Sequence, residues 1–144
     1  MVQSKEGSIV HVEIHSNDPP RTREFFANAF GWKFQDVPEM NYMLWEAPDK
    51  PAGGLQKPME GRGPTVLNYL LSKEINADLG RVQHQGGLVL VPKSEIPNMG
   101  WFAIFQEPGG TVHALYQDMP KPPAPRKAGA RKSAAKKAKA RKKK

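Results

Sequence analysis

The chain has 144 residues, the length of a single domain, and it contains no cysteine, which excludes disulfides, thiolate metal sites and cysteine nucleophiles. No apolar run reaches the roughly 18–20 residues that a membrane-spanning helix needs. The first residues, MVQSKEGSIV, lack the apolar segment of a secretory signal. Together with the absence of cysteine, this favours a cytoplasmic protein.

The net charge of +8 is unevenly distributed along the chain. Residues 120–144 contain 12 of the 22 Lys and Arg residues and no Asp or Glu, so residues 1–119 carry 10 basic and 14 acidic side chains, a net charge of −4. We therefore expect a folded domain over residues 1–119. Residues 120–144 should form a disordered tail rich in Pro, Ala and Lys, because the tail has too little apolar surface to fold.

The cations of this tail predict salt-dependent, sequence-independent binding to polyanions such as nucleic acids, because neutralised phosphates release counterions. The tail has no aromatic residue that could stack on bases. A solubilising role and an anionic lipid surface are the alternatives. The residues predicted to bind polyanions are Lys127, Arg131, Lys132, Lys136, Lys137, Lys139, Arg141, Lys142, Lys143 and Lys144.

The first predicted module, about residues 7–58, begins with an alternating strand at residues 8–16. A helix follows, with Asp18 as its N-cap, an apolar stripe over residues 25–30 and Gly31 as its end. Three strand candidates complete the module, at residues 32–36, 42–46 and 53–56.

The second predicted module, about residues 62–118, repeats this order. It has a strand at residues 65–71, a helix at residues 76–85 and strands at residues 88–91, 101–106 and 111–117. We expect Lys93 and Glu95 in a loop between two of these strands. Two such repeats predict an α+β fold, in which two βαβββ modules form a cupped mixed β-sheet with the helices on its outer face.

Three motifs carry a resemblance to a known family: FFANAFGW after NDP, GGLVLVPKSEIP, and EPGGTVHALYQ. Over residues 7–118 the chain resembles the vicinal oxygen chelate superfamily, which includes glyoxalase I, bleomycin-resistance proteins and extradiol dioxygenases. It looks most like the small branch related to lactoylglutathione lyase. The resemblance implies a small-molecule cleft between the modules and a homodimer.

The resemblance also implies a divalent metal, held by four inward-facing side chains from four strands. Carried over by motif spacing, these positions are His11, Glu46, Leu67 and Ala114. Leucine and alanine cannot coordinate a metal, and catalytic metal sites normally have three protein ligands. We therefore favour no metal cofactor; if a divalent metal does bind, His11 and Glu46 are its predicted ligands.

His11, Glu13 and His15 alternate along the first strand and so share one face. Two interpretations stay open. This face is solvated, or a Glu–His pair provides hydrogen bonding or general acid–base catalysis, with His11 and Glu13 as the catalytic candidates. The predicted ligand-pocket residues are His15, Tyr42, Glu46, Leu67, Tyr69, Ala114 and Tyr116.

The predicted function is that of a small-molecule-binding protein or enzyme of the glyoxalase/bleomycin resistance type, with a degenerate, metal-free site. Whether it catalyses a reaction stays open. One alternative is a metal-dependent lyase or dioxygenase. A second alternative is a nucleic-acid-associated binding module that acts through the basic tail.

Overall fold

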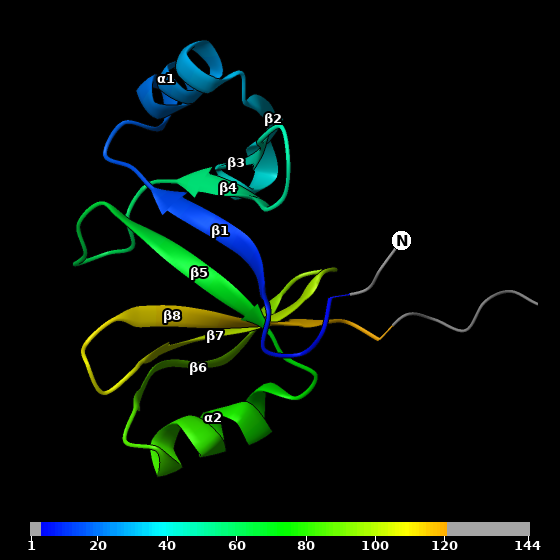
Figure 1. The fold of residues 1–144 in the computed structure, drawn as a ribbon, viewed down its shortest axis with the longest axis vertical. Coiled ribbons are helices and arrows are strands. Elements are labelled where there is room, and N and C mark those ends of the chain that lie inside the picture. Colours follow the sequence, from blue (N-terminus) through cyan, green and yellow to red (C-terminus); the bar gives the residue numbers. More distant parts are fainter. Residues whose placement is uncertain (1–3, 121–144) are drawn as a thin grey trace, which may run out of the picture.

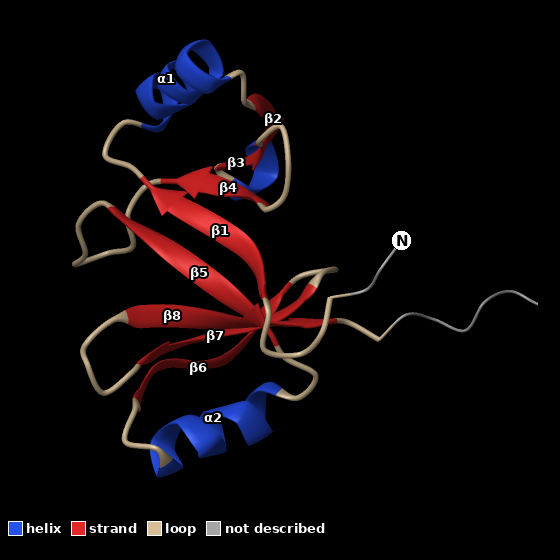
Figure 2. Ribbon diagram, in the orientation of Figure 1, coloured by secondary structure: helices blue, strands red, loops and turns tan. Residues whose placement is uncertain are grey.

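A computed structural model describes residues 4–120 of the protein. It shows an α+β fold of two βαβββ modules, which confirms the predicted fold class (Figures 1 and 2). None of the helices in this part of the chain combines the length and apolar character needed to cross a membrane. The elements are β1 (Ile9–His15), α1 (Pro19–Phe30), β2 (Lys33–Val37), the 3-10 helix η1 (Pro38–Met40), β3 (Tyr42–Glu46), β4 (Ala52–Gln56), β5 (Thr65–Leu71), α2 (Ile75–His84), β6 (Leu88–Ile96), β7 (Gly100–Gln106) and β8 (Val112–Asp118).

The strands of the described chain form one mixed sheet in the order β2-β3-β4-β1-β5-β8-β7-β6. The first and last strands of each module are parallel neighbours, β1 with β4 and β5 with β8. The two modules join through the antiparallel pair β1 and β5, in which His11 lies opposite Tyr69 and Glu13 lies opposite Leu67. The centre of the sheet is therefore the place where the modules meet, with α1 and α2 towards opposite ends (Figure 1).

Local signals fix the ends of α1 as the sequence predicts. The side chain of Asp18 accepts a hydrogen bond from the backbone N–H of Arg21 at 3.2 Å, which satisfies a free donor of the first turn. Gly31 ends the helix with a φ of 73°, a left-handed conformation that glycine adopts without steric cost.

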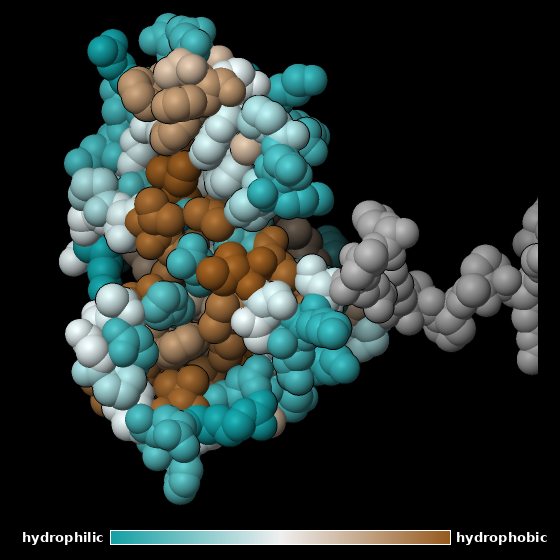
Figure 3. All heavy atoms as spheres, in the orientation of Figure 1, coloured by the Kyte–Doolittle hydropathy of each residue, from teal (hydrophilic) through white to brown (hydrophobic). Residues whose placement is uncertain are grey.

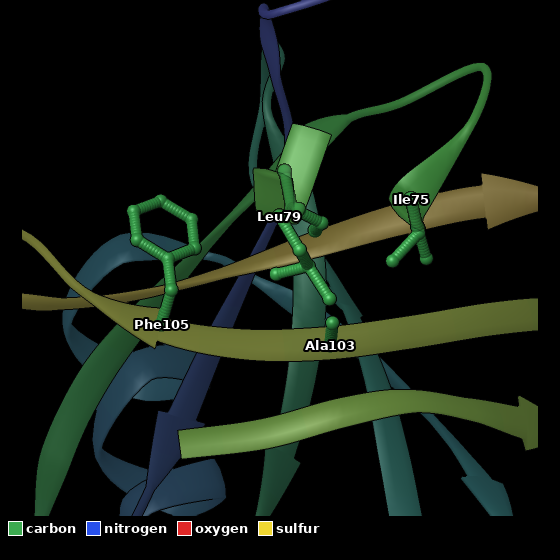
Figure 4. Close-up of a cluster of buried hydrophobic side chains, with 5 residues drawn as sticks. Ile75, Leu79, Ala103 and Phe105 are labelled. Atoms are coloured by element: carbon green, nitrogen blue, oxygen red, sulfur yellow. The ribbon is translucent and has the colours of Figure 1, made fainter. Parts of the chain in front are cut away.

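The outer face of the second module is covered by α2. Ile75 and Leu79 pack against Ala103, Phe105 and Leu115 of β7 and β8, and all five side chains are buried (Figure 4). Burial of such aliphatic side chains contributes about 1.5–3 kcal/mol each. This cluster therefore holds α2 firmly against the sheet.

The apolar stripe of α1 is covered less completely. Phe26 stacks on Trp32 and Trp32 on Trp45, with ring centroids 4.3 and 4.1 Å apart. Phe25 and Phe30, by contrast, are 58% and 59% exposed. The stripe at residues 25–30 is therefore only partly a core surface, and helical spacing alone does not distinguish the half-buried Phe26 from the exposed side chains.

The predicted loop that carries Lys93 and Glu95 is wrong, because both residues lie within β6. The pairing of β6 with β7 shifts register between Val91 and Ser94. Such an irregularity accommodates Pro92, which cannot donate a ladder hydrogen bond. The strand continues beyond it, and the Lys93 ammonium lies 4.6 Å from the centre of the Trp101 ring.

Candidate functional site

The inner face of the sheet, opposite the helices, carries a cluster of hydrogen-bonded polar side chains. At its centre is the carboxylate of Glu13. Its Oε1 accepts hydrogen bonds from His15 Nε2 at 2.8 Å, the Tyr69 hydroxyl at 3.0 Å and the Gln56 amide at 3.2 Å. Its Oε2 accepts one from the Tyr42 hydroxyl at 2.8 Å. We call these five residues, together with His11, the Glu13 network.

The environment of Glu13 keeps its carboxyl group ionised. Glu13 is only 6% exposed. Burial alone would raise the pKa of Glu13, but hydrogen bonds from His15, Tyr42 and Tyr69 and the charge of His15 outweigh it, so the pKa lies below its ordinary value. The pKa values of Tyr42 and Tyr69 are raised by burial and by the negative charge of Glu13. Both phenols therefore stay protonated and act as donors.

His11 connects to this network through Tyr42. Burial lowers the pKa of His11, partly offset by the charge of Glu13, so its ring is neutral at neutral pH. The Tyr42 hydroxyl has one hydrogen, and it donates this hydrogen in the bond to Glu13. Its oxygen therefore accepts the hydrogen bond from His11 Nε2 at 2.8 Å. Nε2 therefore carries the proton of the ring, and Nδ1 is left as a free acceptor.

The two histidines of β1 differ in access. Nδ1 of His15 is buried and has no hydrogen-bond partner, and it is alone in this among the side-chain nitrogens and oxygens of the described residues. Nδ1 of His11 also has no partner among these residues, but it is not sealed from solvent. Nδ1 of His11 is therefore the accessible one of these two nitrogens, whereas His15, also a member of the network, is 1% exposed.

The interpretation of a solvated face does not describe these residues, since Glu13 and His15 are buried. The other half of the inner face is apolar. Leu67, Tyr69, Ile104 and Ala114 form a buried cluster there. The half-buried side chains packed against this cluster are Met59, Leu90, Val91, Phe102, Val112 and Tyr116. The inner face is thus polar over the first module and apolar over the second.

Most of the predicted pocket residues lie in or beside this arrangement, but Glu46 does not. Glu46 is exposed and lies in β3, opposite Lys33 and Ala52. Sequence reasoning missed Gln56. The available signal was the alternation of the predicted strand, which puts Gln56 on the same face as Gly54. Hollows of about 550 Å³ along α1 and about 330 Å³ beside α2 involve no residue of the Glu13 network.

The residues of the inner face do not fit the four-ligand metal of the superfamily. In residues 4–120, no three His, Asp or Glu side chains lie close enough together to hold one ion. Leu67 and Ala114, at two of the carried-over positions, lie in the apolar cluster. The donor set offers hydrogen bonds rather than a coordination shell.

Comparisons with known sequences agree with the motifs. A family model described as "Bleomycin resistance protein-like N-terminal" matches residues 8–48. The putative glyoxylase CFP32 of Mycobacterium tuberculosis is 24% identical over 121 residues, which cover 78% of this chain and 46% of that protein. A glyoxylase-like domain-containing protein of Didymella fabae is 25% identical over 118 residues, 76% of this chain and 92% of its own. The chain spans about half the length of the CFP32 relatives.

Solved structures share the fold. Methylmalonyl-CoA epimerase from Mycobacterium tuberculosis has a TM-score of 0.62 at 16% identity, over 83% of this chain and 94% of that one. The hypothetical protein BH1468 from Bacillus halodurans has a TM-score of 0.62 at 13% identity, over 82% and 99%. The fold class that these proteins share with the chain is thus that of paired βαβββ modules. The sequence matches are described as glyoxylase-like and bleomycin-resistance-like. Together with the shared fold, they confirm the predicted resemblance to the vicinal oxygen chelate superfamily.

Proposed function

We propose that this protein binds a small organic molecule beside His11 on the inner face of the sheet, in the cytoplasm and without a bound metal. The observation that carries the proposal is the chain of two 2.8 Å hydrogen bonds from His11 Nε2 through the Tyr42 hydroxyl to Glu13. This chain fixes the tautomer of His11, so that Nδ1 can accept a hydrogen bond from an O–H or N–H group of the ligand.

The cost of the Glu13 network supports a functional role. A buried carboxylate loses its hydration and is stable only when several donors replace the water. If this part of the sheet served packing alone, aliphatic side chains such as those of the second module would fill it at no such cost. The network therefore supports a site in which polar groups are held in place for a ligand.

The same atoms define the chemistry that an enzyme of this kind would use. Transfer of a ligand proton to Nδ1 would make His11 an imidazolium, and the negative charge of Glu13, acting through Tyr42, would stabilise that cation. The apolar cluster around Leu67 and Ile104 would contact the carbon skeleton of the ligand. We therefore propose a ligand that combines a hydrogen-bond donor with an apolar body.

A matched pair of probes tests the proposal. p-Cresol carries a hydroxyl donor, and 4-methylanisole has nearly the same shape without the donor. We expect p-cresol, and not 4-methylanisole, to shift the His11 ring signals in NMR titrations. His11→Ala should abolish binding, whereas His84→Ala, a change at an exposed position of α2, should leave it unchanged. Equal binding of both probes, or undiminished binding by His11→Ala, would contradict the proposal.

We also propose the homodimer that the resemblance implies. Apolar side chains gather over β1 and β5 between the two helices (Figure 3). Val66 of β5 is 57% exposed, and Phe25 of α1 is 58% exposed. Apolar groups left in water at such sites favour association. Sedimentation velocity on the full chain tests this, with Val66→Lys expected to favour the monomer.

A second candidate function rests on the charge of residues 120–144, of which residues 121–144 lie outside the described residues. Their 12 basic side chains without an acidic one support binding to DNA or RNA through phosphates alone. We expect affinity for a duplex to fall steeply with salt and to be lost when the tail is removed. Affinity that survives removal of the tail would contradict this candidate.

A further inference from the structure

The internal repeat of the fold identifies which residues of the two modules are equivalent. α1 begins at Pro19 and α2 at Ile75, an offset of 56 residues (75 − 19). The same offset makes His11 equivalent to Leu67 and Glu13 equivalent to Tyr69. The register agrees, because the opposed pair His11 and Tyr69 then exchanges with the opposed pair Leu67 and Glu13, as a twofold relation between β1 and β5 requires.

The same relation extends to the last strand of each module. Gly54 of β4 lies opposite Glu13, and Ala114 of β8 lies opposite Tyr69. Because Glu13 and Tyr69 are equivalent, Gly54 is the counterpart of Ala114. Motif spacing places the fourth metal position at Ala114, so the second position falls on Gly54. Glu46, the residue carried over by motif spacing, lies one strand further out, on β3.

The space above Gly54 is filled by Tyr42. A Cβ atom added at Gly54 would collide with the hydroxyl and the ring of Tyr42. That hydroxyl also bonds to His11 Nε2 and to Glu13 Oε2, each at 2.8 Å. The volume into which a ligating side chain at residue 54 would extend is therefore filled by the phenol of Tyr42. This phenol is hydrogen-bonded to His11, which is the one of the four metal positions that carries a residue able to ligate a metal.

We infer that the Tyr42 hydroxyl has taken the place of the metal at this site, joining His11 to Glu13 where the superfamily places a cation between side chains. Gly54 permits this substitution, since any larger residue would displace the phenol. The inference deepens the proposed function, because it names the group that takes over the metal's role as partner of His11. It does not depend on the identity of the ligand.

The first test is metal retention by the full chain. The protein is dialysed against Zn²⁺, Ni²⁺ or Mn²⁺ and the bound metal is measured by mass spectrometry. We expect no stoichiometric ion that depends on His11. One ion per chain that is lost in His11→Ala and kept in His84→Ala would overturn the inference.

The second test restores missing ligands while keeping Gly54, so that the phenol stays in its place. The double variant Leu67→His, Ala114→Glu is compared with the same variant carrying Tyr42→Ala as well. We expect removal of the phenol to tighten Zn²⁺ binding by about tenfold or more, a difference of roughly 1.4 kcal/mol. Equal affinity in the two variants would show that Tyr42 does not occupy the position, and so would overturn the inference.

A third measurement removes a single oxygen atom, should the multiple variants fail to fold. Nitrogen-15 NMR of the His11 ring reports which nitrogen carries the proton. We expect the Nε2–H form in the wild-type protein and a mixture of tautomers in Tyr42→Phe. The same tautomer populations in both proteins would overturn the inference. A failure of p-cresol to bind would instead contradict the proposed function and leave these outcomes unaffected.

Discussion

Replacement of the Glu13 carboxylate by an amide, Glu13→Gln, should destabilise the folded protein. The carboxylate accepts four hydrogen bonds, from His15, Tyr69, Gln56 and Tyr42. A glutamine oxygen can take over one side of this set, but its NH₂ group then faces donors on the other side. Hydrogen bonds to a charged group are worth about 1.5–3 kcal/mol each, so we expect a loss of about 2 kcal/mol in the free energy of unfolding.

Urea unfolding at pH 7, followed by tryptophan fluorescence, measures this loss. Trp45 is 4% exposed and lies in β3, the strand that begins at Tyr42, so its emission reports on the first module. The matched control is Glu46→Gln, which removes an exposed carboxylate from the same strand and should change stability by less than about 0.5 kcal/mol. A Glu13→Gln protein as stable as this control would refute the role of the network.

The pH dependence gives a second readout of the same change. The pKa of Glu13 is lowered in the folded protein from its ordinary value of 4.5, chiefly because hydrogen bonds from His15 and Tyr42 outweigh burial. A lowered folded pKa adds stability above the unfolded pKa, and this stability is lost as pH falls through the folded pKa. The gap between wild type and Glu13→Gln should therefore hold from pH 7 to about 5 and narrow at more acidic pH. A gap that widens on acidification would contradict the reasoning.

Two further measurements test other parts of the structure. Burial raises the pKa of Tyr116 to about 12 and also raises those of Tyr42 and Tyr69, so the folded protein should show little phenolate absorbance at 295 nm at pH 10. Ordinary phenols are about half ionised at this pH, so absorbance near half of the fully ionised value would contradict the buried network. Leu79→Ala should lose about 3 kcal/mol of stability by leaving a cavity under α2, while Phe25→Ala, at an exposed site, should stay within about 0.5 kcal/mol of wild type.

The elements that sequence predicts well are those set by local chemistry. Asp18 and Gly31 fix α1 through a side-chain cap and a left-handed glycine, and both effects depend on residues within one turn. The alternation of His11, Glu13 and His15 likewise fixes the face to which they point. The predicted strand at residues 88–91 is the first part of β6, but its continuation through Lys93 and Glu95 was missed, because proline normally interrupts a strand and the register shift against β7 accommodates Pro92.

The hydrogen bonds that Tyr42 and Gln56 make to Glu13 could not be predicted in the same way. Tyr42 and Gln56 reach it because β4 lies between β3 and β1 and because Gly54 leaves room for a ring to cross. That order is a long-range property of the sheet, and alternation gives the face of a residue without its neighbours. For the same reason motif spacing pointed to Glu46, whereas the register identifies Gly54.

The two tyrosines of the network should differ in their importance, although both donate to Glu13. Tyr69 shares Oε1 with His15 and Gln56, so Tyr69→Phe leaves that oxygen with two donors. Tyr42 is the donor to Oε2 among the described residues, and it also accepts from His11. Because little water can reach Glu13, Tyr42→Phe leaves both groups without a partner. We expect a loss of about 2–3 kcal/mol for Tyr42→Phe and about 1 kcal/mol for Tyr69→Phe in urea unfolding. The reverse order would mean that the relay through Tyr42 is not the bond that holds the network together.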